Sequence, residues 1–352
     1  DDDVDIIGTD PGRNDAHPFA FIGPGDGREL PVGRFGLNPL KMGRNLAHTA
    51  RVAHQDDGRR QLARTQVQMK DRAVAVDYQL GGGYLSHVIK SISGIRGTIG
   101  GAAGDNLTPL DLVKFTSAYA EWLKGEHPGR RLKVVIGRDA RLSGEMAAAI
   151  VEGTLCGCGV DVINIGLATT PTVELAVTGK QADGGIILTA SHNPKQWNAL
   201  KLLNSHGEFL NDAEGKKVLA LAQAGVSAYP EIDRIGRVIE RSSYNDEHIR
   251  GALALKLADL DAVRKAKFKV VVDAVNSVGG VVIPKLLREM GVEVVELNCT
   301  PDGNFAHNPE PIPENLTEIS ARVPAEKADL GIIVDPDVDR LALVCEDGTM
   351  FG

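Results

Sequence analysis

The residues best suited to do chemistry begin with a serine and a histidine side by side. Ser191 and His192 follow a short apolar run, Ile186 to Leu188, which predicts a buried strand with a loop at its C-terminal end. In open α/β sheets, ligands bind at that end of the strands. A hydroxyl beside an imidazole, with Lys201 ten residues further along the chain, could accept and release a phosphoryl group.

Three alternating carboxylates follow a second apolar run. Leu330 to Val334 predicts another buried strand, and Asp335, Asp337 and Asp339 come directly after it. Carboxylates gathered at the end of a strand need a cation, and a hard divalent ion such as Mg²⁺ is the natural choice. We expect Ser191 and the three aspartates to converge, and together they indicate metal-assisted phosphoryl transfer.

The aspartate loop has two other interpretations. An EF-hand also alternates carboxylates, but it requires glycine where Arg340 stands, and its flanks are helices rather than strands. A phosphatase of the haloacid dehalogenase type would use Asp335 as its nucleophile. Such an enzyme needs a lysine and further carboxylates downstream, and only twelve residues follow Arg340. The phosphatase stays open as an alternative.

A set of motifs in a fixed order resembles the α-D-phosphohexomutases, the family of phosphoglucomutase, phosphomannomutase and phosphoglucosamine mutase. The motifs are Ser93-Gly-Ile-Arg-Gly97, Gly137-Arg-Asp-Ala-Arg-Leu-Ser-Gly144, Thr189-Ala-Ser-His-Asn-Pro194, Asp335-Pro-Asp-Val-Asp-Arg340, and Asp302-Gly-Asn-Phe305 followed by His307-Asn-Pro-Glu-Pro311. One such motif could arise by chance, whereas the ordered set is specific. The resemblance covers residues 88 to 352.

The resemblance implies an intramolecular phosphotransferase, an isomerase that interconverts hexose 1-phosphate and hexose 6-phosphate. Ser191 would carry the phosphoryl group as a phosphoserine, and a sugar bisphosphate would be the intermediate. His192 would steer phosphoryl oxygens or move protons. Lys201 would assist proton transfer at the sugar hydroxyl, which requires a depressed pKa. Mg²⁺ would be held by the three aspartates and by an oxygen on Ser191.

Three arginines are candidates for phosphate binding, because a guanidinium can make bidentate contacts to phosphate. Arg96 matches an active-site arginine of the family. Arg138 lies among small residues that let the backbone approach closely, and Arg340 is expected near the metal and the phosphoserine. Pro336 and Val338 stand where the family usually has glycine, which keeps every metal ligand and is expected to stiffen the loop.

Composition and charge exclude several classes of protein. The net charge of −8 argues against a nucleic-acid-binding protein, which would carry a basic patch. The chain has no run of about 18 apolar residues, so no membrane span is predicted. The four cysteines form no CxxC pair and are expected to be reduced thiols of a cytoplasmic protein. A hexose phosphate is the expected partner, and neither its sugar nor the oligomeric state is predicted.

The patterns predict an α/β fold of two successive three-layer α/β domains with mixed sheets. We expect domain I over residues 88–240, with the phosphoserine loop, and domain II over residues 241–352, with the metal loop. A polar stretch over residues 229–244 is expected to separate them, and a single helix is expected over residues 246–265. Residues 1–87 lack a sustained period and are interpreted as an irregular extension or as sequence foreign to the native protein.

The family's third and fourth domains carry a sugar-binding Gly-Glu motif and a Ser-Gly-Thr phosphate loop. The resemblance ends before these two domains, so the chain is expected to be a fragment with little mutase turnover of its own. A non-catalytic fragment that binds metal only is therefore a further alternative.

Overall fold

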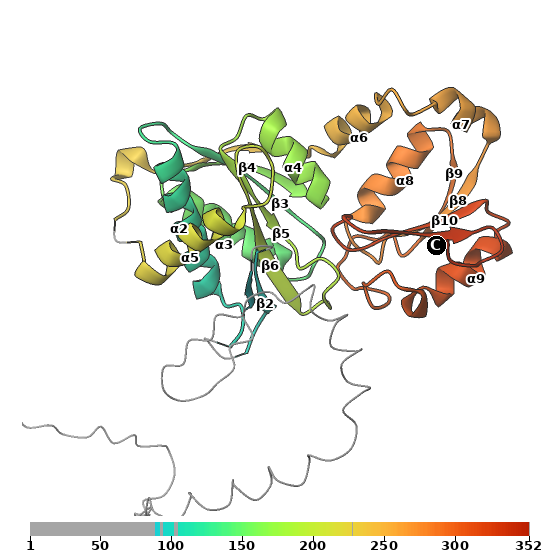
Figure 1. The fold of residues 1–352 in the computed structure, drawn as a ribbon, viewed down its shortest axis with the longest axis horizontal. Coiled ribbons are helices and arrows are strands. Elements are labelled where there is room, and N and C mark those ends of the chain that lie inside the picture. The colour runs from blue at the N-terminus through green and yellow to red at the C-terminus, as the bar shows by residue number, and fades with distance from the viewer. Residues whose placement is uncertain (1–88, 92–93, 102–104, 227, 352) are drawn as a thin grey trace, which may run out of the picture. The chain divides into compact units, whose positions relative to one another are not determined.

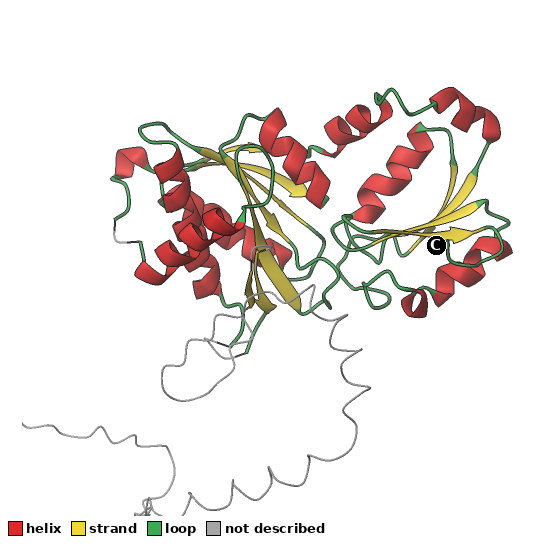
Figure 2. Cartoon of the chain, in the orientation of Figure 1, coloured by secondary structure: helices red, strands yellow, loops and turns green. Residues whose placement is uncertain are grey.

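The computed structural model describes residues 89–91, 94–101, 105–226 and 228–351. The interpretation of residues 1–87 as an extension lies outside these residues, as does Ser93 of the first motif. All described residues fall within one unit of the chain, Lys70–Gly352. They form two sheets with helices on both faces of each (Figures 1 and 2).

The first sheet has seven strands in the order β1-β2-β6-β5-β3-β4-β7. Strands β5, β3, β4 and β7 are parallel, whereas β6, β2 and β1 each pair antiparallel with their neighbours. The sheet is therefore mixed, as predicted. Its strands are β1 (Ile89–Ser91), β2 (Gly94–Thr98), β3 (Lys133–Arg138), β4 (Asp161–Leu167), β5 (Gly184–Leu188), β6 (Trp197–Leu203) and β7 (Val238–Arg241).

Helices cover both faces of this sheet because its central strands are apolar on both sides. Along β3, Val134 and Ile136 pack into the core beneath α2, α3 and α5, while Val135 packs into the core on the α4 side (Figure 1). Successive side chains of a strand point to opposite faces, so one strand supplies both cores. The helices are α2 (Pro109–Glu126), α3 (Gly144–Gly157), α4 (Thr170–Gly179) and α5 (Asp212–Ala224).

The second sheet repeats this plan with four strands in the order β11-β10-β8-β9. Val270 and Val272 pack on the side of α8, and Val271 packs against α9 on the other side. β9, β8 and β10 are parallel, and β11 returns antiparallel from β10. The elements are β8 (Lys269–Asp273), α8 (Gly279–Glu289), β9 (Glu293–Leu297), a 3₁₀ turn η2 (Pro313–Asn315), α9 (Thr317–Ala325), β10 (Leu330–Val334) and β11 (Leu341–Cys345). The prediction of two three-layer α/β units with mixed sheets is confirmed.

The segment between the sheets differs from the prediction in two places. The expected polar separator contains a 3₁₀ turn η1 (Ile232–Arg234) and the edge strand β7, so the first sheet extends to Arg241. An edge strand buries few side chains. In β7, half-buried residues alternate with exposed ones, so the sequence of this strand shows only a weak apolar pattern. The expected single helix is two helices, α6 (Asn245–Leu253) and α7 (Leu260–Ala266), because Asp259 caps a new helix by accepting a hydrogen bond from the backbone N–H of Ala262.

The cysteines and the helices relate to two further expectations from the sequence. Cys156, Cys158, Cys299 and Cys345 are all free thiols. Within the described residues, every helix is too short or too polar to cross a bilayer.

A buried tyrosine provides a test of how the first core is held. The Tyr119 hydroxyl donates a 2.6 Å hydrogen bond to the carbonyl of Leu203 on β6 and lies 3.2 Å from the carbonyl of Gly185. We expect Tyr119→Phe to lower the free energy of unfolding by about 1 kcal/mol, because a buried carbonyl loses its donor. Urea unfolding measures this, with Tyr229→Phe as the exposed control. Equal stability of the two variants would contradict the expectation.

Candidate functional site

Ser191 and Asp335 are in direct contact although 144 positions separate them in the sequence. The Ser191 hydroxyl donates a 2.8 Å hydrogen bond to Oδ2 of Asp335. Ser191 follows β5 and Asp335 follows β10, so the C-terminal ends of strands from the two sheets meet at this point. The predicted convergence of the serine with the aspartate loop is thus confirmed by this contact.

The aspartate loop gathers three carboxylates in a tight turn. One oxygen each from Asp335, Asp337 and Asp339 lies within 4.8 Å of the other two. The turn closes because Oδ1 of Asp335 accepts hydrogen bonds from the backbone N–H groups of Asp339 and Arg340, both at 3.1 Å. The loop is flanked by β10 and β11, which excludes the helix-loop-helix of an EF-hand.

The donor set of this loop fits a hard divalent cation. Asp335 and Asp337 are fully buried, and Oδ1 of Asp337 has no hydrogen-bond partner among the described residues. A buried carboxylate oxygen without a donor is costly unless something positive satisfies it. Carboxylate oxygens are the ligands that Mg²⁺ prefers, so the three aspartates suit this ion.

Burial and mutual repulsion shape the titration of these carboxyls. Burial, together with the charges of Asp337 and Asp339, raises the pKa of Asp335 to about 8. Burial also works to raise the pKa of Asp337, but the Lys201 ammonium and hydrogen bonds from Lys201 and Thr170 outweigh it, and this pKa is lowered. One ammonium therefore does not neutralise the whole loop, which favours a further cation.

Lys201 enters the loop from β6 and is largely buried. Its ammonium donates to Oδ2 of Asp337 at 2.7 Å and to Oδ2 of Asp339 at 3.0 Å. The expectation of a depressed pKa for Lys201 is wrong in this structure. Burial works to lower the pKa of Lys201, but the two carboxylates outweigh burial and raise it. A depressed pKa requires desolvation or nearby cations, whereas the fold places two aspartates beside Lys201.

The N-terminus of α4 also faces the aspartate loop. The backbone N–H of Thr170 donates to the carbonyl of Asp337 at 2.8 Å, and the Thr170 hydroxyl donates to Oδ2 of the same residue at 2.6 Å. A helix N-terminus is favourable for negative charge. Sequence reasoning missed Thr170, although Thr169-Thr170-Pro171 is typical of a helix start.

His192 and Arg340 share one carboxylate, which sequence reasoning also missed. Nε2 of His192 lies 3.2 Å from Oε2 of Glu310, and Arg340 donates to Oε1 of Glu310. Burial and the positive charge of Arg340 lower the pKa of His192. Glu310 belongs to the fifth sequence motif, so its position could have been found there.

The other two candidate arginines have different surroundings. Arg96 on β2 is close enough to His192 to help lower its pKa, and in the described chain its Nε is buried with no hydrogen-bond partner. Arg138 instead donates to the carbonyl of Asp139 at 3.1 Å and to Glu145 at 3.0 Å. Within the described ranges no hydrogen bond or ion pair joins Arg138 to Ser191, and its predicted phosphate contact stays a prediction.

A buried ion pair lies beneath the serine loop. Nε of Arg141 donates to Oδ2 of Asp139 at 2.9 Å, and both side chains are fully buried. Asp139 and Arg141 belong to the same sequence motif as Arg138. Charged residues after a strand are usually solvated, so the sequence did not predict this buried pair. The ring of Phe305 from the second sheet's loops lies 5.1 Å from the Arg141 guanidinium.

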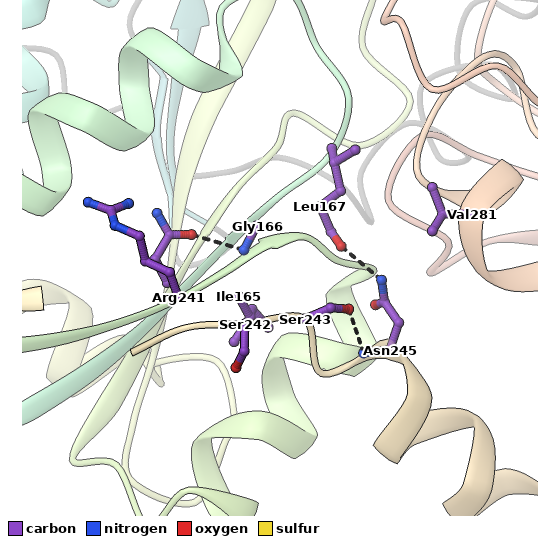
Figure 3. A pocket seen from close by; sticks show the side chains of 9 residues that line it. Ile165, Gly166, Leu167, Arg241, Ser242, Ser243, Asn245 and Val281 are labelled. Carbon is purple, nitrogen blue, oxygen red and sulfur yellow. Dashed lines mark hydrogen bonds between the residues drawn. The ribbon is translucent and has the colours of Figure 1, made fainter. Parts of the chain in front are cut away.

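A separate pocket lies at the C-terminal end of β4 (Figure 3). In it, Asn245 donates to the carbonyl of Leu167, and its own backbone N–H donates to the Ser243 hydroxyl. None of the predicted site residues lines this pocket. Its lining consists of Asn164, Ile165, Gly166, Leu167, Arg241, Ser242, Ser243, Asn245 and Val281.

Comparison with known families matches both halves of the described chain. The model of phosphoglucomutase/phosphomannomutase α/β/α domain I matches residues 88–228, and the model of domain II matches residues 246–348. The two ranges contain the serine loop and the aspartate loop respectively.

Individual proteins show the same similarity over part of their length. The chain is 36% identical over 261 residues to a "probable phosphoglucosamine mutase" of Methanopyrus kandleri, covering 74% of this chain and 54% of that protein. It is 38% identical over 257 residues to a phosphoglucomutase/phosphomannomutase of Thermococcus kodakarensis, covering 72% and 55%. The crystal structure of a phosphoglucomutase/phosphomannomutase family protein from Burkholderia thailandensis aligns with a TM-score of 0.61 at 27% identity. The alignment covers 73% of this chain and 54% of that protein. The chain thus spans about half the length of the relatives it matches.

The pair of half-buried His307 and buried Asp273 is expected to make the stability of the fold depend on pH. Nε2 of His307 lies 3.1 Å from Oδ2 of Asp273. Burial works to lower the pKa of His307, but Asp273, with a smaller effect from Glu318, outweighs it, and the pKa lies above the usual value of about 6.5. A raised folded-state pKa means that the stabilisation is present below the unfolded pKa and is lost as pH rises through the folded pKa.

We therefore expect the free energy of unfolding to fall as the pH is raised above about 6.5, and to fall less in His307→Gln than in the wild type. Urea unfolding at several pH values measures this, with His206→Gln at an exposed histidine as the control. If the free energies of unfolding of His307→Gln and the wild type changed in parallel with pH, the pair would contribute nothing to the pH dependence of stability.

Mg²⁺ should stabilise the fold through the aspartate loop. An ion that binds only the folded state adds about 2.7 kcal/mol at a hundred times its Kd. We expect Mg²⁺ to raise the Tm of the wild type and of Asp347→Asn, a change in the exposed turn after β11, but not of Asp337→Asn. An equal rise in the Tm of Asp337→Asn would show that the ion binds elsewhere. No rise in the Tm of the wild type would contradict a metal site in this loop.

Proposed function

Because the chain belongs to the phosphoglucomutase/phosphomannomutase family, we propose that it contains the phosphoryl-carrying half of a phosphohexomutase. Ser191 carries a phosphoryl group, which it exchanges with a hexose phosphate so that 1-phosphate and 6-phosphate interconvert through a sugar bisphosphate. The observation that carries this proposal is the 2.8 Å hydrogen bond from the Ser191 hydroxyl to Asp335. It puts the group that accepts the phosphoryl beside the carboxylates that suit a metal.

The three aspartates would hold Mg²⁺, with an oxygen of phosphorylated Ser191 as a further ligand. Such an ion supplies Lewis-acid stabilisation of charge on the phosphoryl oxygens. The buried Oδ1 of Asp337 supports this assignment, because it has no hydrogen-bond partner among the described residues and so has lone pairs free to bind an ion.

The residues around the serine would stabilise charge and move a proton during transfer. The bond from the serine oxygen to phosphorus breaks while a sugar hydroxyl oxygen forms a new bond to phosphorus, and the hydroxyl proton leaves. The lowered pKa of His192 keeps its imidazole neutral near pH 7 and able to accept that proton. Lys201, held as an ammonium by two carboxylates, is suited to stabilise charge rather than to act as a base.

Arg96 and Arg340 are the arginines best placed to bind phosphate. The buried Nε of Arg96 has no hydrogen-bond partner in the part of the chain that the structure describes. Arg340 reaches the site from the end of the aspartate loop, where its backbone N–H binds Asp335 and its side chain meets Glu310. Catalysis of this kind depends mainly on positioning and charge stabilisation.

The alternative of a haloacid dehalogenase-type phosphatase fits the site less well. A nucleophilic Asp335 would need a free carboxylate oxygen. Its Oδ1 accepts two backbone hydrogen bonds, and its Oδ2 accepts the Ser191 hydroxyl. The same contacts would orient Asp335 as a metal ligand.

Phosphorylation of Ser191 tests the proposal, because every residue proposed for that partial reaction is in the described chain. After incubation with glucose 1,6-bisphosphate and Mg²⁺, we expect the peptide that contains Ser191 to gain the mass of one phosphoryl group. Ser191→Ala should gain none, and Ser205→Ala, in the turn after β6, should behave as the wild type. Phosphorylation that persists in Ser191→Ala would overturn the assignment of the carrier.

The sugar is tested separately with glucose 1-phosphate, mannose 1-phosphate and glucosamine 6-phosphate. The phosphorylated chain should transfer its phosphoryl group to at least one of the three, and mass spectrometry of the chain follows the loss. A phosphoserine inert to all three, with the chain otherwise folded, would support the alternative of a non-catalytic fragment that binds metal only.

A further inference from the structure

Ser191 has a backbone conformation that side chains rarely adopt. Its φ is +49°, in the left-handed region that disfavours residues with a Cβ. From this conformation its hydroxyl meets Asp335. The surrounding structure must therefore hold the Ser191 backbone in place.

Both peptide groups of Ser191 end on one buried network. The Ser191 N–H donates to the Thr189 hydroxyl at 2.9 Å, and that hydroxyl donates to Oδ2 of Asp139 at 2.7 Å. Asp139 accepts Nε of Arg141 at 2.9 Å, and Nη2 of Arg141 donates to the carbonyl of Ser191. The hydrogen bonds form a closed ring that starts and ends at the serine.

The Arg141 guanidinium is the centre of this network. Besides Asp139 and Ser191, it donates to the carbonyls of Asn193 and Pro194, both at 2.8 Å, and of Trp197 at 3.0 Å. An arginine side chain has five N–H donors, and five acceptors surround this one. Without the cation, four carbonyls of one loop would face each other in a buried space, where unpaired polar groups are costly.

Arg141 cannot itself reach a substrate. Its side chain has no exposed surface, and the ring of Phe305 covers the guanidinium from the second sheet's side. Lysine has three donors on a single nitrogen and cannot reproduce a planar fork of five. Any effect of Arg141 on phosphoryl transfer must therefore pass through the serine loop.

We propose that Arg141 is a positioning residue, which with Asp139 and Thr189 fixes the left-handed Ser191 so that its hydroxyl points at the aspartate loop. This inference rests on the proposed function of Ser191 as the phosphoryl carrier. It predicts that a weakened network slows the phosphorylation of Ser191 without changing how well the donor sugar binds.

The test compares Arg141→Lys and Thr189→Val with the matched control Arg131→Lys. Arg131 makes a bidentate pair with Asp161, at 2.6 and 2.7 Å, at the N-terminal ends of β3 and β4, whereas the serine loop follows the C-terminal end of β5. The rate of Ser191 phosphorylation is measured against the concentration of glucose 1,6-bisphosphate. We expect Arg141→Lys to lower the maximal rate about a hundredfold, the loss that a 1 Å misplacement can cause, with the half-saturating concentration unchanged.

We expect Thr189→Val to lower the maximal rate in the same way, and Arg131→Lys to match the wild type. If Arg141→Lys fails to fold, Thr189→Val decides the question, because it removes one hydroxyl and keeps the ion pair. Wild-type maximal rates in the folded variants, or a change in half-saturation alone, would overturn the proposal.

Amide hydrogen exchange separates this proposal from the proposed function. Faster exchange at Ser191 and Asn193 in Arg141→Lys, with β5 unchanged, supports the positioning role even if the wild-type serine is never phosphorylated. Unchanged exchange at these two amides would overturn the positioning role, whatever the fate of the proposed function.

Discussion

Two fully buried carboxylates, Asp335 and Asp337, set the constraint on which the rest of the site depends. Negative charge away from water must be met by positive charge or by hydrogen-bond donors. Groups from the first α/β unit supply this charge and these donors. The Ser191 hydroxyl, the Lys201 ammonium and Thr170 at the N-terminus of α4 all donate hydrogen bonds to the aspartate loop. The chemistry of one loop thus determines which parts of the first sheet must lie against the second.

The fold meets this constraint with repeated α/β layers. β5 is buried along its whole length and β10 at three of its five residues, so the serine and the aspartates follow strands that are packed in the protein core. A second buried network, centred on Arg141, fixes the serine loop from below. Glu310 links His192 to Arg340, so residues that would meet a phosphate are held before any ligand arrives.

Much of this arrangement could be predicted from local sequence. The strands that carry Ser191 and Asp335 are continuous apolar runs, which are typical of strands covered on both faces. The loops after them were found because serine, histidine and alternating aspartates are unusual at such positions. Ordered motifs then connected the two loops.

What the sequence could not show depends on contacts between distant segments. Arg141 and Glu310 look like ordinary surface charges until the fold buries one and pairs the other with His192. The role in proton transfer that the resemblance implies for Lys201 requires a depressed pKa, whereas the aspartates that raise this pKa lie 136 and 138 positions away in the chain. The edge strand β7 was missed because an edge buries too few residues to leave a clear pattern.

The position of a bound metal tests the central claim most directly, namely that the serine and aspartate loops form one metal-dependent phosphoryl site. Crystals of the chain phosphorylated at Ser191 and soaked with Mn²⁺ would show the ion by its anomalous scattering. The account predicts one peak bound by oxygens of Asp335, Asp337 and Asp339 and by an oxygen on Ser191. A peak whose ligands exclude Ser191, or no peak at the aspartate loop, would contradict it.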